Sequence, residues 1–365
     1  MNILFISTHL NTGGITSYLL TLGQGLKARG HTVYVASSGG ECVQKFEETG
    51  ISVVHVPINT KSEANFFKIF STVCVLKRFI RNNNIHLIHS HTRVTQVAGC
   101  FLQSLCRIPH VSTCHGFFKA RLFRRIFPCW GNRIIAISEP VRQHLIRDFG
   151  ISREIIELIH NGIDTHRFLS VSENKDKGGI KKRMGMLSGP VVGIIARLSD
   201  VKGHVYLIEA MKRVSAISPN VQLLIVGDGK MKGILVEKVK DLKMEASVYF
   251  VPEIEDTVDA LAAMDVFVMP SLQEGLGLGL MEAMAAGLPV IGSDVGGIRS
   301  LIIREKTGIL VEPGNSESIA TAITDVLTDT LKAGILGKNA QEFIQSNFNS
   351  ETMVTLTEKL YASLL

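Results

Sequence analysis

Residues 269–290 read MPSLQEGLGLGLMEAMAAGLPV, and this stretch holds the features that decide the fold. The apolar residues 266–269 predict a buried strand, and residues 280–286 predict a helix. Between them lies a Gly-Leu-Gly-Leu-Gly turn at 275–279. A turn with so little side chain leaves its backbone N–H groups accessible, and the start of a helix adds partial positive charge. This pattern predicts a phosphate-binding loop in an α/β protein.

Two acids accompany this turn. Glu274 precedes it and Glu282 is predicted in the first turn of the helix, with seven residues between them. A carboxylate accepts hydrogen bonds, so each acid suits a neutral hydroxyl of a ribose or a sugar rather than a phosphate. The stretch therefore indicates a site for a sugar joined to a nucleotide diphosphate. On spacing alone, a glycine-rich turn in an ordinary α/β protein is an equally good interpretation.

The length and composition indicate a globular chain of two domains. The 365 residues fit two domains of about 170 residues each. The N-terminal sequence MNILFISTHL has no basic region before it and no small-residue cleavage site, so we expect a first strand rather than a signal peptide. No stretch approaches eighteen uncharged apolar residues, so no membrane-spanning helix is expected. A cytoplasmic protein is the resulting expectation.

The charge is uneven along the chain. The first 170 residues hold 19 Lys and Arg against 9 Asp and Glu, a net charge of +10. The remaining residues have a net charge of −4, which gives the total of +6. A basic first half predicts an anionic partner, unless its charges are simply solvated. No nucleic-acid-binding motif accompanies the charge, so nucleic acid is not expected. The six cysteines have no C-x-x-C pairing, which predicts neither a zinc site nor a disulfide scaffold.

Short β-branched runs alternate with helical patterns in both halves, which predicts two doubly wound parallel sheets. Strands are predicted over residues 2–7, 31–36, 52–56, 86–90, 110–113, 133–137 and 155–159, and then over 191–196, 221–226, 247–251, 266–269, 290–292 and 308–311. Helices are predicted over residues 15–28, 61–81, 92–106, 120–130, 139–148, 205–216, 230–242, 280–286, 317–327, 331–346 and 351–364. The polar residues 170–189 are interpreted as the junction between the domains.

Two cations follow the strand at 191–196. Arginine forks onto two phosphate oxygens, and lysine supplies a mobile point charge, so Arg197 and Lys202 suit a diphosphate. A leaving diphosphate gains negative charge as its glycosidic bond breaks, and these cations would then stabilise the transition state more than the ground state. Two surface charges around a turn are the alternative.

The first half contributes two further candidates. Gly13 and Gly14 follow the first strand, at the edge where doubly wound folds bind ligands, but the pattern is not G-x-G-x-x-G, so no dinucleotide cofactor is predicted. A simple tight turn is the alternative. His115 follows an interior strand and is expected to point into the cleft between the domains. A structural hydrogen-bonding role is the alternative for this histidine.

His89 and His91 lie two residues apart, so their side chains share one face of a strand. They suggest either a metal pair or a structural role, and no third ligand at a suitable spacing supports the metal. A D-x-D motif is absent, because the acids at 256 and 259 have the wrong spacing. We therefore predict no metal site.

Taken in order, these motifs resemble those of the retaining GT-B glycosyltransferases of the large family 4. Residues 274–290 resemble the E-x7-E signature, with Leu276 where the family usually has Phe, and residues 193–203 resemble the GRLxxxKG signature. Residues 227–229 resemble the family's GxG turn, and residues 161–164 its NG(V/I)D element. The resemblance covers nearly the whole chain. It implies two Rossmann-like domains facing across a cleft: an acceptor-binding domain at 1–168, onto which the helix at 350–365 packs back, and a donor-binding domain at 169–349.

The resemblance also implies roles for individual residues. Arg197 and Lys202 would hold the donor diphosphate. Glu274 would hold a hydroxyl of the donor sugar, with His115 on its other side. Glu282 would bind the ribose hydroxyls. The donor-binding residues that it implies are Gly13, Gly14, Gly227, Pro252, Gly275, Leu276, Gly277, Leu278 and Glu282.

The resemblance implies a metal-independent hexosyltransferase that needs no cofactor. No side chain is placed as a covalent nucleophile, so we expect the acceptor hydroxyl to attack the front face of the donor sugar, with the departing phosphate oxygen accepting its proton. A UDP-sugar is expected ahead of a GDP-sugar, although Pro252 stands where relatives often have Gly and leaves the base open. Two alternatives remain: the protein is a nucleotide-sugar 2-epimerase of the same fold, or it is a noncatalytic sugar-nucleotide-binding protein.

The acceptor is expected to be a glycan or lipid-linked acceptor in cell-surface polysaccharide or lipopolysaccharide biosynthesis, because the first half is basic. Residues 117–127 interleave arginine with aromatic residues on a predicted helix. Such a helix suits an anionic bilayer surface, which would place the protein peripherally at the inner face of the cell membrane, and the helix at 65–81 could contribute. Burial of the phenylalanines against the sheet is the alternative.

Overall fold

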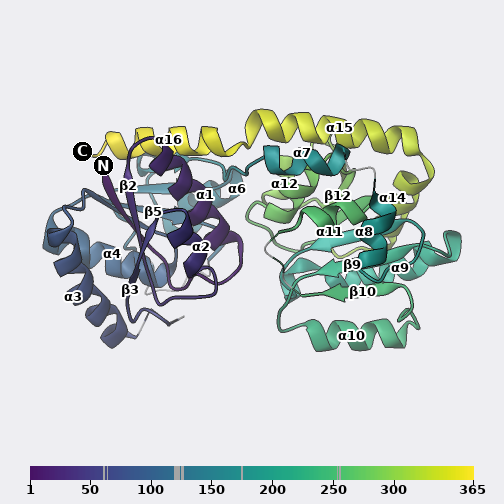
Figure 1. The fold of residues 1–365 in the computed structure, drawn as a ribbon, viewed down its shortest axis with the longest axis horizontal. Helices are drawn as coiled ribbons and strands as arrows, with labels where there is room; N and C mark the ends of the chain where they lie inside the picture. Colours follow the sequence, from purple (N-terminus) through teal and green to yellow (C-terminus); the bar gives the residue numbers. More distant parts are fainter. Residues whose placement is uncertain are drawn as a thin grey trace. The chain divides into compact units, whose positions relative to one another are not determined.

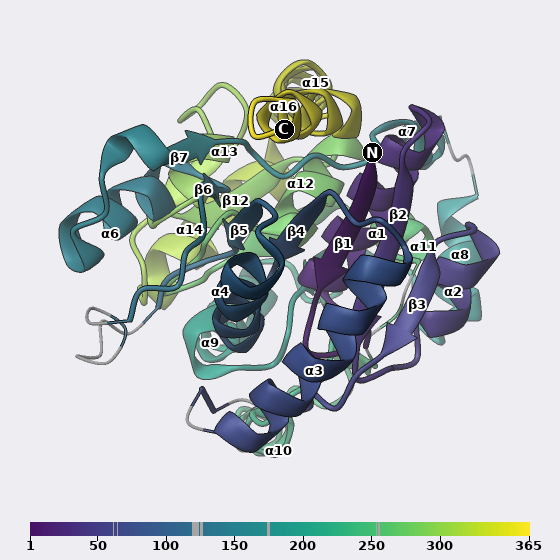
Figure 2. The same ribbon diagram turned by 90° about the vertical axis from the view of Figure 1, so that its left-hand side faces the viewer.

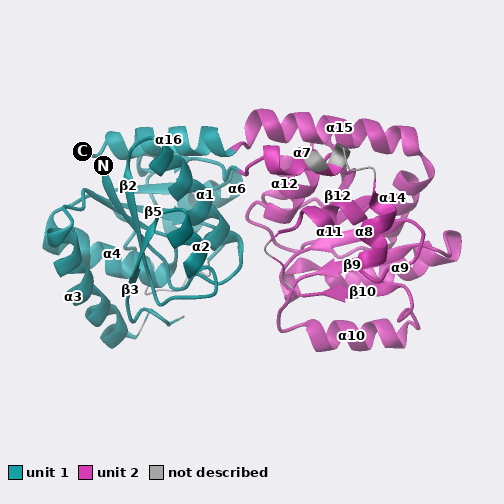
Figure 3. Cartoon of the chain, in the orientation of Figure 1, with its two compact units in different colours: residues 1–162, 350–365 teal, residues 163–349 magenta. Residues whose placement is uncertain are grey.

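The chain forms two compact units, each built on one parallel sheet (Figures 1 and 3). Unit 1 comprises Met1–Gly162 and Ser350–Leu365, and unit 2 comprises Ile163–Asn349. The structure, a computed structural model, describes residues 1–60, 62–63, 65–118, 124, 127–173, 176–252, 254 and 256–365.

The sheet of unit 1 has seven parallel strands in the order β3-β2-β1-β4-β5-β6-β7. The strand order reverses between β1 and β4, which are neighbours although β2 and β3 separate them in the chain. In an open α/β sheet, this reversal marks the edge where ligands bind. The strands are β1 (Asn2–Ile6), β2 (Thr32–Ser37), β3 (Ser52–His55), β4 (Leu87–Ser90), β5 (His110–Cys114), β6 (Arg133–Ala136) and β7 (Ile156–Leu158).

Helices cover both faces of this sheet because alternate strand residues are apolar on each face. One buried cluster joins Phe5 of β1 to α1 (Gly14–Ala28) and α16 (Ser350–Ala362). The opposite cluster joins Ile6 of β1 to α3 (Phe66–Asn82) and α4 (Arg93–Cys106), which pack side by side (Figures 1 and 2). In the part of unit 1 that the structure describes, the further helices are α2 (Val43–Glu48), α6 (Glu139–Phe149) and the 3₁₀ helix η1 (Arg153–Ile155).

The sheet of unit 2 has six parallel strands in the order β10-β9-β8-β11-β12-β13, with the reversal between β8 and β11. Its four central strands are buried runs made up mainly of apolar residues, as a parallel sheet covered on both faces requires. The strands are β8 (Val191–Ile195), β9 (Gln222–Val226), β10 (Val248–Val251), β11 (Val266–Met269), β12 (Val290–Ser293) and β13 (Ile309–Val311).

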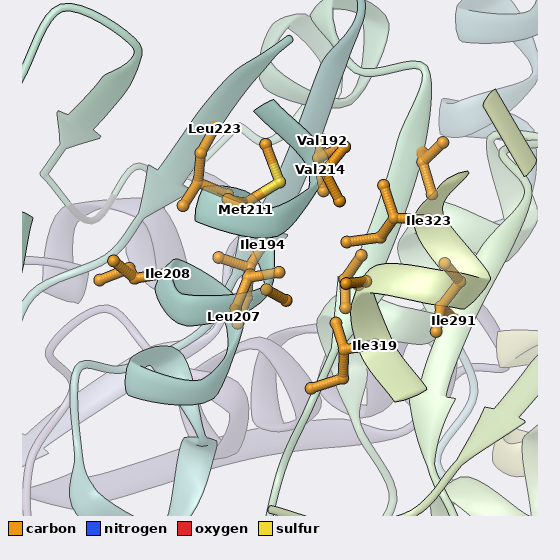
Figure 4. Close-up of a cluster of buried hydrophobic side chains, with 14 of the residues drawn as sticks. Val192, Ile194, Leu207, Ile208, Met211, Val214, Leu223, Ile291, Ile319 and Ile323 are labelled. Carbon is orange, nitrogen blue, oxygen red and sulfur yellow. The ribbon is translucent and has the colours of Figure 1, made fainter. Parts of the chain in front are cut away.

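The core of unit 2 lies between this sheet and two long helices. Ile194 of β8 packs with Leu207 and Met211 of α9 and with Ile319 and Ile323 of α14 (Figure 4). The helices of unit 2 are α7 (His166–Glu173), α8 (Lys177–Arg183), the 3₁₀ helix η2 (Asp200–Lys202), α9 (His204–Ile217), α10 (Lys232–Asp241), α11 (Val258–Ala263), α12 (Leu278–Ala285), α13 (Ile298–Leu301), α14 (Ser316–Thr328) and α15 (Thr330–Asn347).

The predicted α/β fold with two doubly wound parallel sheets is confirmed, and every predicted strand is present. The domain boundary is different from the predicted one. The chain leaves unit 1 between residues 162 and 163 rather than between 168 and 169, because α7 packs against α11 and α12 of unit 2.

The interpretation of residues 170–189 as a junction was wrong, because these residues contain α8 and belong to unit 2. Lys181 of α8 contacts Asp265 at 2.9 Å, and Asp265 also accepts a hydrogen bond from the backbone N–H of Val191 at 2.9 Å. These contacts attach the helix to the first strand of the unit 2 sheet.

Part of the predicted basic aromatic helix at 120–130 lies outside the described residues, which exclude 119–123 and 125–126. At its end, Cys129 has a left-handed backbone with φ of 52° and is not helical. The neighbouring α3 begins at Phe66 rather than at residue 61, and the Asn65 side chain caps it by accepting from the N–H of Lys68 at 3.3 Å. Among the helices that the structure describes, none is long and apolar enough to cross a membrane.

Candidate active site

Most candidate residues of unit 2 lie in loops at the carboxyl edge of its sheet, and Leu278 and Glu282 lie in α12, which follows one of these loops. Arg197 lies two residues after the end of β8 and is exposed, and it forms no ion pair with any residue that the structure describes. Lys202 ends η2, and Gly203, which follows it, adopts the left-handed conformation at φ 72°. A Cβ at Gly203 would lie 1.9 Å from the carbonyl oxygen of Pro270, so only glycine allows this loop to approach the end of β11.

Lys202 and Glu274 form an ion pair between the loops that follow β8 and β11. The side chain of Lys202 is 18% exposed and that of Glu274 is 10% exposed. The Ser271 hydroxyl donates to the same carboxylate at 3.4 Å, and the backbone N–H of Gly275 contacts its other oxygen at 3.2 Å. A cation and an acid are therefore held next to each other with restricted side-chain freedom.

Glycines bring the start of α12 against the end of β8. A Cβ on Gly279 would lie 2.5 Å from the carbonyl oxygen of Ile195. Gly277, the N-terminal cap residue of α12, has φ of 99° and provides no side-chain cap, so the first N–H groups of the helix have no side-chain acceptor. Leu276 is buried, which leaves its backbone rather than its side chain for a ligand. Leu278, at the start of the helix, is half-buried.

A second close approach joins the loops after β8, β9 and β10. A Cβ on Gly227 would lie 2.2 Å from the carbonyl oxygen of Ala196, next to Arg197. The N–H of Gly227 also donates to the carbonyl of Val251 at 2.9 Å, directly before Pro252. The structure therefore brings the predicted residues from the loops after β8, β9, β10 and β11 to one edge of the sheet.

Glu282 lies in the second turn of α12 rather than in the predicted first turn, because the helix begins at Leu278. Its Oε2 accepts a hydrogen bond from the hydroxyl of Thr257 at 2.9 Å. Burial raises the pKa of Glu282 to about 7, and the Thr257 hydrogen bond and the charge of Arg167 oppose that rise. Thr257 was not predicted as a site residue. The only signal it offers in the sequence is its place before a short helix.

In unit 1, the loop after β1 contacts the loop after β2. Gly13 caps α1 with φ of 147° and no side-chain cap, and Gly14 begins the helix. The backbone N–H of Thr12 donates to Glu41 at 2.8 Å, and this hydrogen bond lowers the pKa of that carboxyl. The exposed start of α1 thus stands at the strand reversal of unit 1, as the start of α12 does in unit 2.

His115 lies between α1 and the loop after β4. Its Nε2 is 3.2 Å from Nδ1 of His91, and the ring of Tyr18 contacts it edge-on with a centroid distance of 4.9 Å. Burial lowers the pKa of His115 to about 3, and that of His91 well below its usual value, so both rings are neutral at pH 7. The His115 ring is therefore held one turn from the Gly14 end of α1. Tyr18 was not predicted, because its spacing is that of a core residue.

His89 and His91 share a face as predicted, with ring centroids 4.1 Å apart, and the structural interpretation of His89 fits its contacts. Nδ1 of His89 lies 2.5 Å from the hydroxyl of Tyr361, and its Nε2 lies 2.7 Å from that of Thr113. Tyr361 is on α16, so this buried contact holds the C-terminal helix on unit 1. In the described part of the chain, no group of three or more His, Cys, Asp or Glu side chains is arranged to hold a metal ion.

Two family models match the chain in succession. The model described as Glycosyltransferase Family 4 matches residues 12–167, and that described as Glycosyl transferases group 1 matches residues 181–343. The two matches correspond closely to the two units of the structure.

Relatives match along most of the chain. An uncharacterized glycosyltransferase of Methanocaldococcus jannaschii is 27% identical over 96% of this chain and 94% of its own. A UDP-Gal:alpha-D-GlcNAc-diphosphoundecaprenol alpha-1,3-galactosyltransferase of Escherichia coli is 26% identical over 82% of this chain and 81% of its own. The crystal structure of Anabaena HepE in complex with UDP-glucose covers all of both chains with a TM-score of 0.89 and 24% identity. The chain belongs to the family 4 glycosyltransferases of GT-B fold.

Proposed function

We propose that the protein transfers a hexose from a UDP-sugar to an acceptor hydroxyl, with retention of the anomeric configuration and without a metal ion. The observation that supports this most directly is the Lys202–Glu274 ion pair, which lies at the same carboxyl edge of the unit 2 sheet as the exposed Arg197. One edge of the sheet thus offers cations for a diphosphate and an acid for a sugar hydroxyl.

The donor is held by unit 2 in this proposal. Arg197 and Lys202 bind the diphosphate together with the N–H groups at the start of α12, where the helix dipole favours an anion. Glu274 accepts a hydrogen bond from a hydroxyl of the sugar, and Glu282 accepts from the ribose. Uridine is favoured as the base, because HepE was solved with UDP-glucose and the E. coli relative is named for UDP-Gal.

The reaction proceeds by attack on the same face of the sugar from which UDP departs. Negative charge grows on the departing phosphate oxygen, where Arg197 and Lys202 stabilise it. That oxygen then accepts the proton of the acceptor hydroxyl. His115 contacts the transferred sugar in this proposal, and its low pKa keeps it neutral, so it acts as a hydrogen-bonding group rather than as a cation. No side chain is assigned as a covalent nucleophile.

The acceptor is proposed to be a lipid-linked glycan at the inner face of the cell membrane, in cell-surface polysaccharide assembly. Three phenylalanines of α3, Phe66, Phe67 and Phe70, are exposed, and Arg78 and Arg81 are exposed further along the same helix. We call these five residues the α3 face. Aromatic rings and arginines on the exposed face of one helix suit the interface of an anionic bilayer. The name of the E. coli relative, which includes diphosphoundecaprenol, points to the same class of acceptor.

Ligand-observed NMR without added metal tests the donor assignment against a panel of UDP- and GDP-sugars. We expect selective binding of one UDP-sugar and its slow hydrolysis. Arg197→Ala should abolish turnover, whereas Arg213→Ala, which removes an exposed arginine of α9, should leave it unchanged. Binding without turnover, even with lipid-linked acceptors, would instead favour a noncatalytic sugar-nucleotide-binding protein, and conversion of the donor to its 2-epimer would favour the epimerase.

A further inference from the structure

Thr257 uses its hydroxyl in an unusual way for its position. It is the residue immediately before α11, where a threonine ordinarily caps the helix by accepting from a backbone N–H. Thr257 makes no such side-chain cap, and its hydroxyl instead donates to Oε2 of Glu282 at 2.9 Å. The residue is 7% exposed, so water competes little for this hydrogen bond.

The charged groups around Glu282 come from two other segments. Arg167 on α7 favours the ionised carboxylate, and Asp256, before α11, disfavours it. Arg167 and Asp256 are themselves 2.8 Å apart, and their effects on the pKa of Glu282 have opposite signs. The hydroxyl of Thr257 is therefore the close donor that orients the Glu282 carboxylate and favours its ionised form.

We propose that Thr257 is a positioning residue for the donor nucleotide, because it fixes Oε2 of Glu282 and leaves Oε1 to accept from the ribose hydroxyls. This inference rests on the proposed function, in which Glu282 binds the ribose. When Thr257 holds one oxygen of the carboxylate, the other oxygen can accept hydrogen bonds from the 2′- and 3′-hydroxyls of a ribose. A sugar that lacks these hydroxyls offers no such hydrogen bond. The pair thus makes the site selective for a ribonucleotide.

The test compares UDP with 2′,3′-dideoxy-UDP, which carries the same diphosphate and base but no ribose hydroxyl. Isothermal titration calorimetry measures both affinities for the wild type, Thr257→Val and the conservative control Thr257→Ser. We expect Thr257→Val to lose about five- to tenfold in UDP affinity at pH 7, with dideoxy-UDP affinity unchanged and Thr257→Ser close to the wild type.

The dependence on pH gives a second readout. The Thr257 hydroxyl lowers the pKa of Glu282, so removing it raises that pKa and leaves less carboxylate ionised at a given pH. The ratio of UDP to dideoxy-UDP affinity should therefore reach its plateau at a higher pH in Thr257→Val than in the wild type. Because both nucleotides carry the same diphosphate, its own protonation changes both affinities alike and does not change their ratio.

The outcomes separate this inference from the proposed function. If Thr257→Val keeps the wild-type ratio, or loses affinity for both nucleotides equally, the positioning role is overturned while the UDP site stands. If the wild type binds neither nucleotide, the proposed function itself fails. Should Thr257→Val not fold, Thr257→Ala is read in the same way, with melting temperature measured alongside.

Discussion

Lys202 and Glu274 join the two loops at the strand reversal of unit 2 through a largely buried ion pair. The residues are 72 positions apart in the chain, yet each follows one of the two strands, β8 and β11, that flank the reversal. A partly buried pair of this kind costs desolvation, and removing one partner leaves the other charge uncompensated. A ligand with an anionic part and a hydroxylated part would give both residues a binding partner, Lys202 for the anion and Glu274 for a hydroxyl.

We predict different effects for the two halves of this pair. Lys202→Met should weaken UDP binding and lower kcat by about a hundredfold, because it removes charge that stabilises the departing diphosphate. Glu274→Gln should bind UDP nearly as the wild type does but lose kcat/KM for the UDP-sugar. Calorimetry with UDP and a UDP-release assay measure both effects. Lys240→Met, which removes an exposed lysine of α10, is the control, and wild-type UDP affinity in Lys202→Met would contradict the prediction.

Gly279→Ala should destabilise unit 2 by about 1–3 kcal/mol, since the new Cβ would lie 2.5 Å from the Ile195 carbonyl oxygen. The displaced helix start should also weaken UDP binding. Gly334→Ala in α15 is the matched control, because a Cβ there meets open space and should stabilise the helix by about 0.5–1 kcal/mol. Melting temperatures should therefore move in opposite directions, and equal shifts would argue against the close packing of α12 on β8.

The buried histidines of unit 1 predict a loss of stability in weak acid. Burial lowers the pKa values of His89 and His91 well below their usual value, and those of His110 and His115 to about 3. Above about pH 6.5 these groups are neutral in both states, and below it the unfolded chain takes up protons that the folded chain does not. Each histidine can then cost up to about 1.4 kcal/mol per pH unit as the pH falls.

Urea unfolding at pH 8, 6 and 5 measures this effect. The unfolding midpoint of the transition that includes unit 1 should fall steadily below pH 6.5 and change little above it. A midpoint that stays constant from pH 8 to 5 would show that these histidines are protonated in the folded state as readily as in the unfolded chain.

The α3 face predicts membrane binding that depends on two exposed rings, because Phe67 is 84% exposed and Phe70 is 69% exposed. The double variant Phe67→Ser, Phe70→Ser should reduce binding to vesicles containing phosphatidylglycerol by about tenfold or more, because transfer of each ring to the interface is lost. The matched control is Leu331→Ser, Ile335→Ser, which removes two exposed apolar residues from α15. Equal binding by the two double variants in a sedimentation assay would exclude the α3 face as the contact.

The strands could be predicted because most of them are short apolar runs between turn residues, a signal that is local in sequence. The helix α8 could not, because its sequence KGGIKKR contains two glycines and no amphipathic pattern. Its position depends on the contact between Lys181 and Asp265, which lie 84 residues apart. Tertiary contacts of this kind leave no local mark in the sequence.

The same distinction applies to the site. Arg197, Lys202 and Glu274 could be named because they follow strands whose carboxyl ends must meet at one edge. The partner of Glu282 could not be named, because Thr257 lies on a different segment. The contact between His89 and Tyr361 could not be predicted either, because the two residues are 272 positions apart in the chain. The roles assigned to the site residues stay predictions that the experiments above test.

The most direct test of the central claim is the anomeric configuration of sugar released from a UDP-α-sugar, followed by proton NMR in its first minutes and in the presence of a chelator. We expect the α anomer to appear first with the wild type, and Arg197→Ala to release no sugar. Initial release of the β anomer would contradict retention, and dependence of turnover on added metal would contradict the metal-independent mechanism. If no nucleotide sugar is turned over under any condition, the proposed transferase activity is wrong, and if none is bound either, the donor site proposed at the edge of unit 2 is wrong as well.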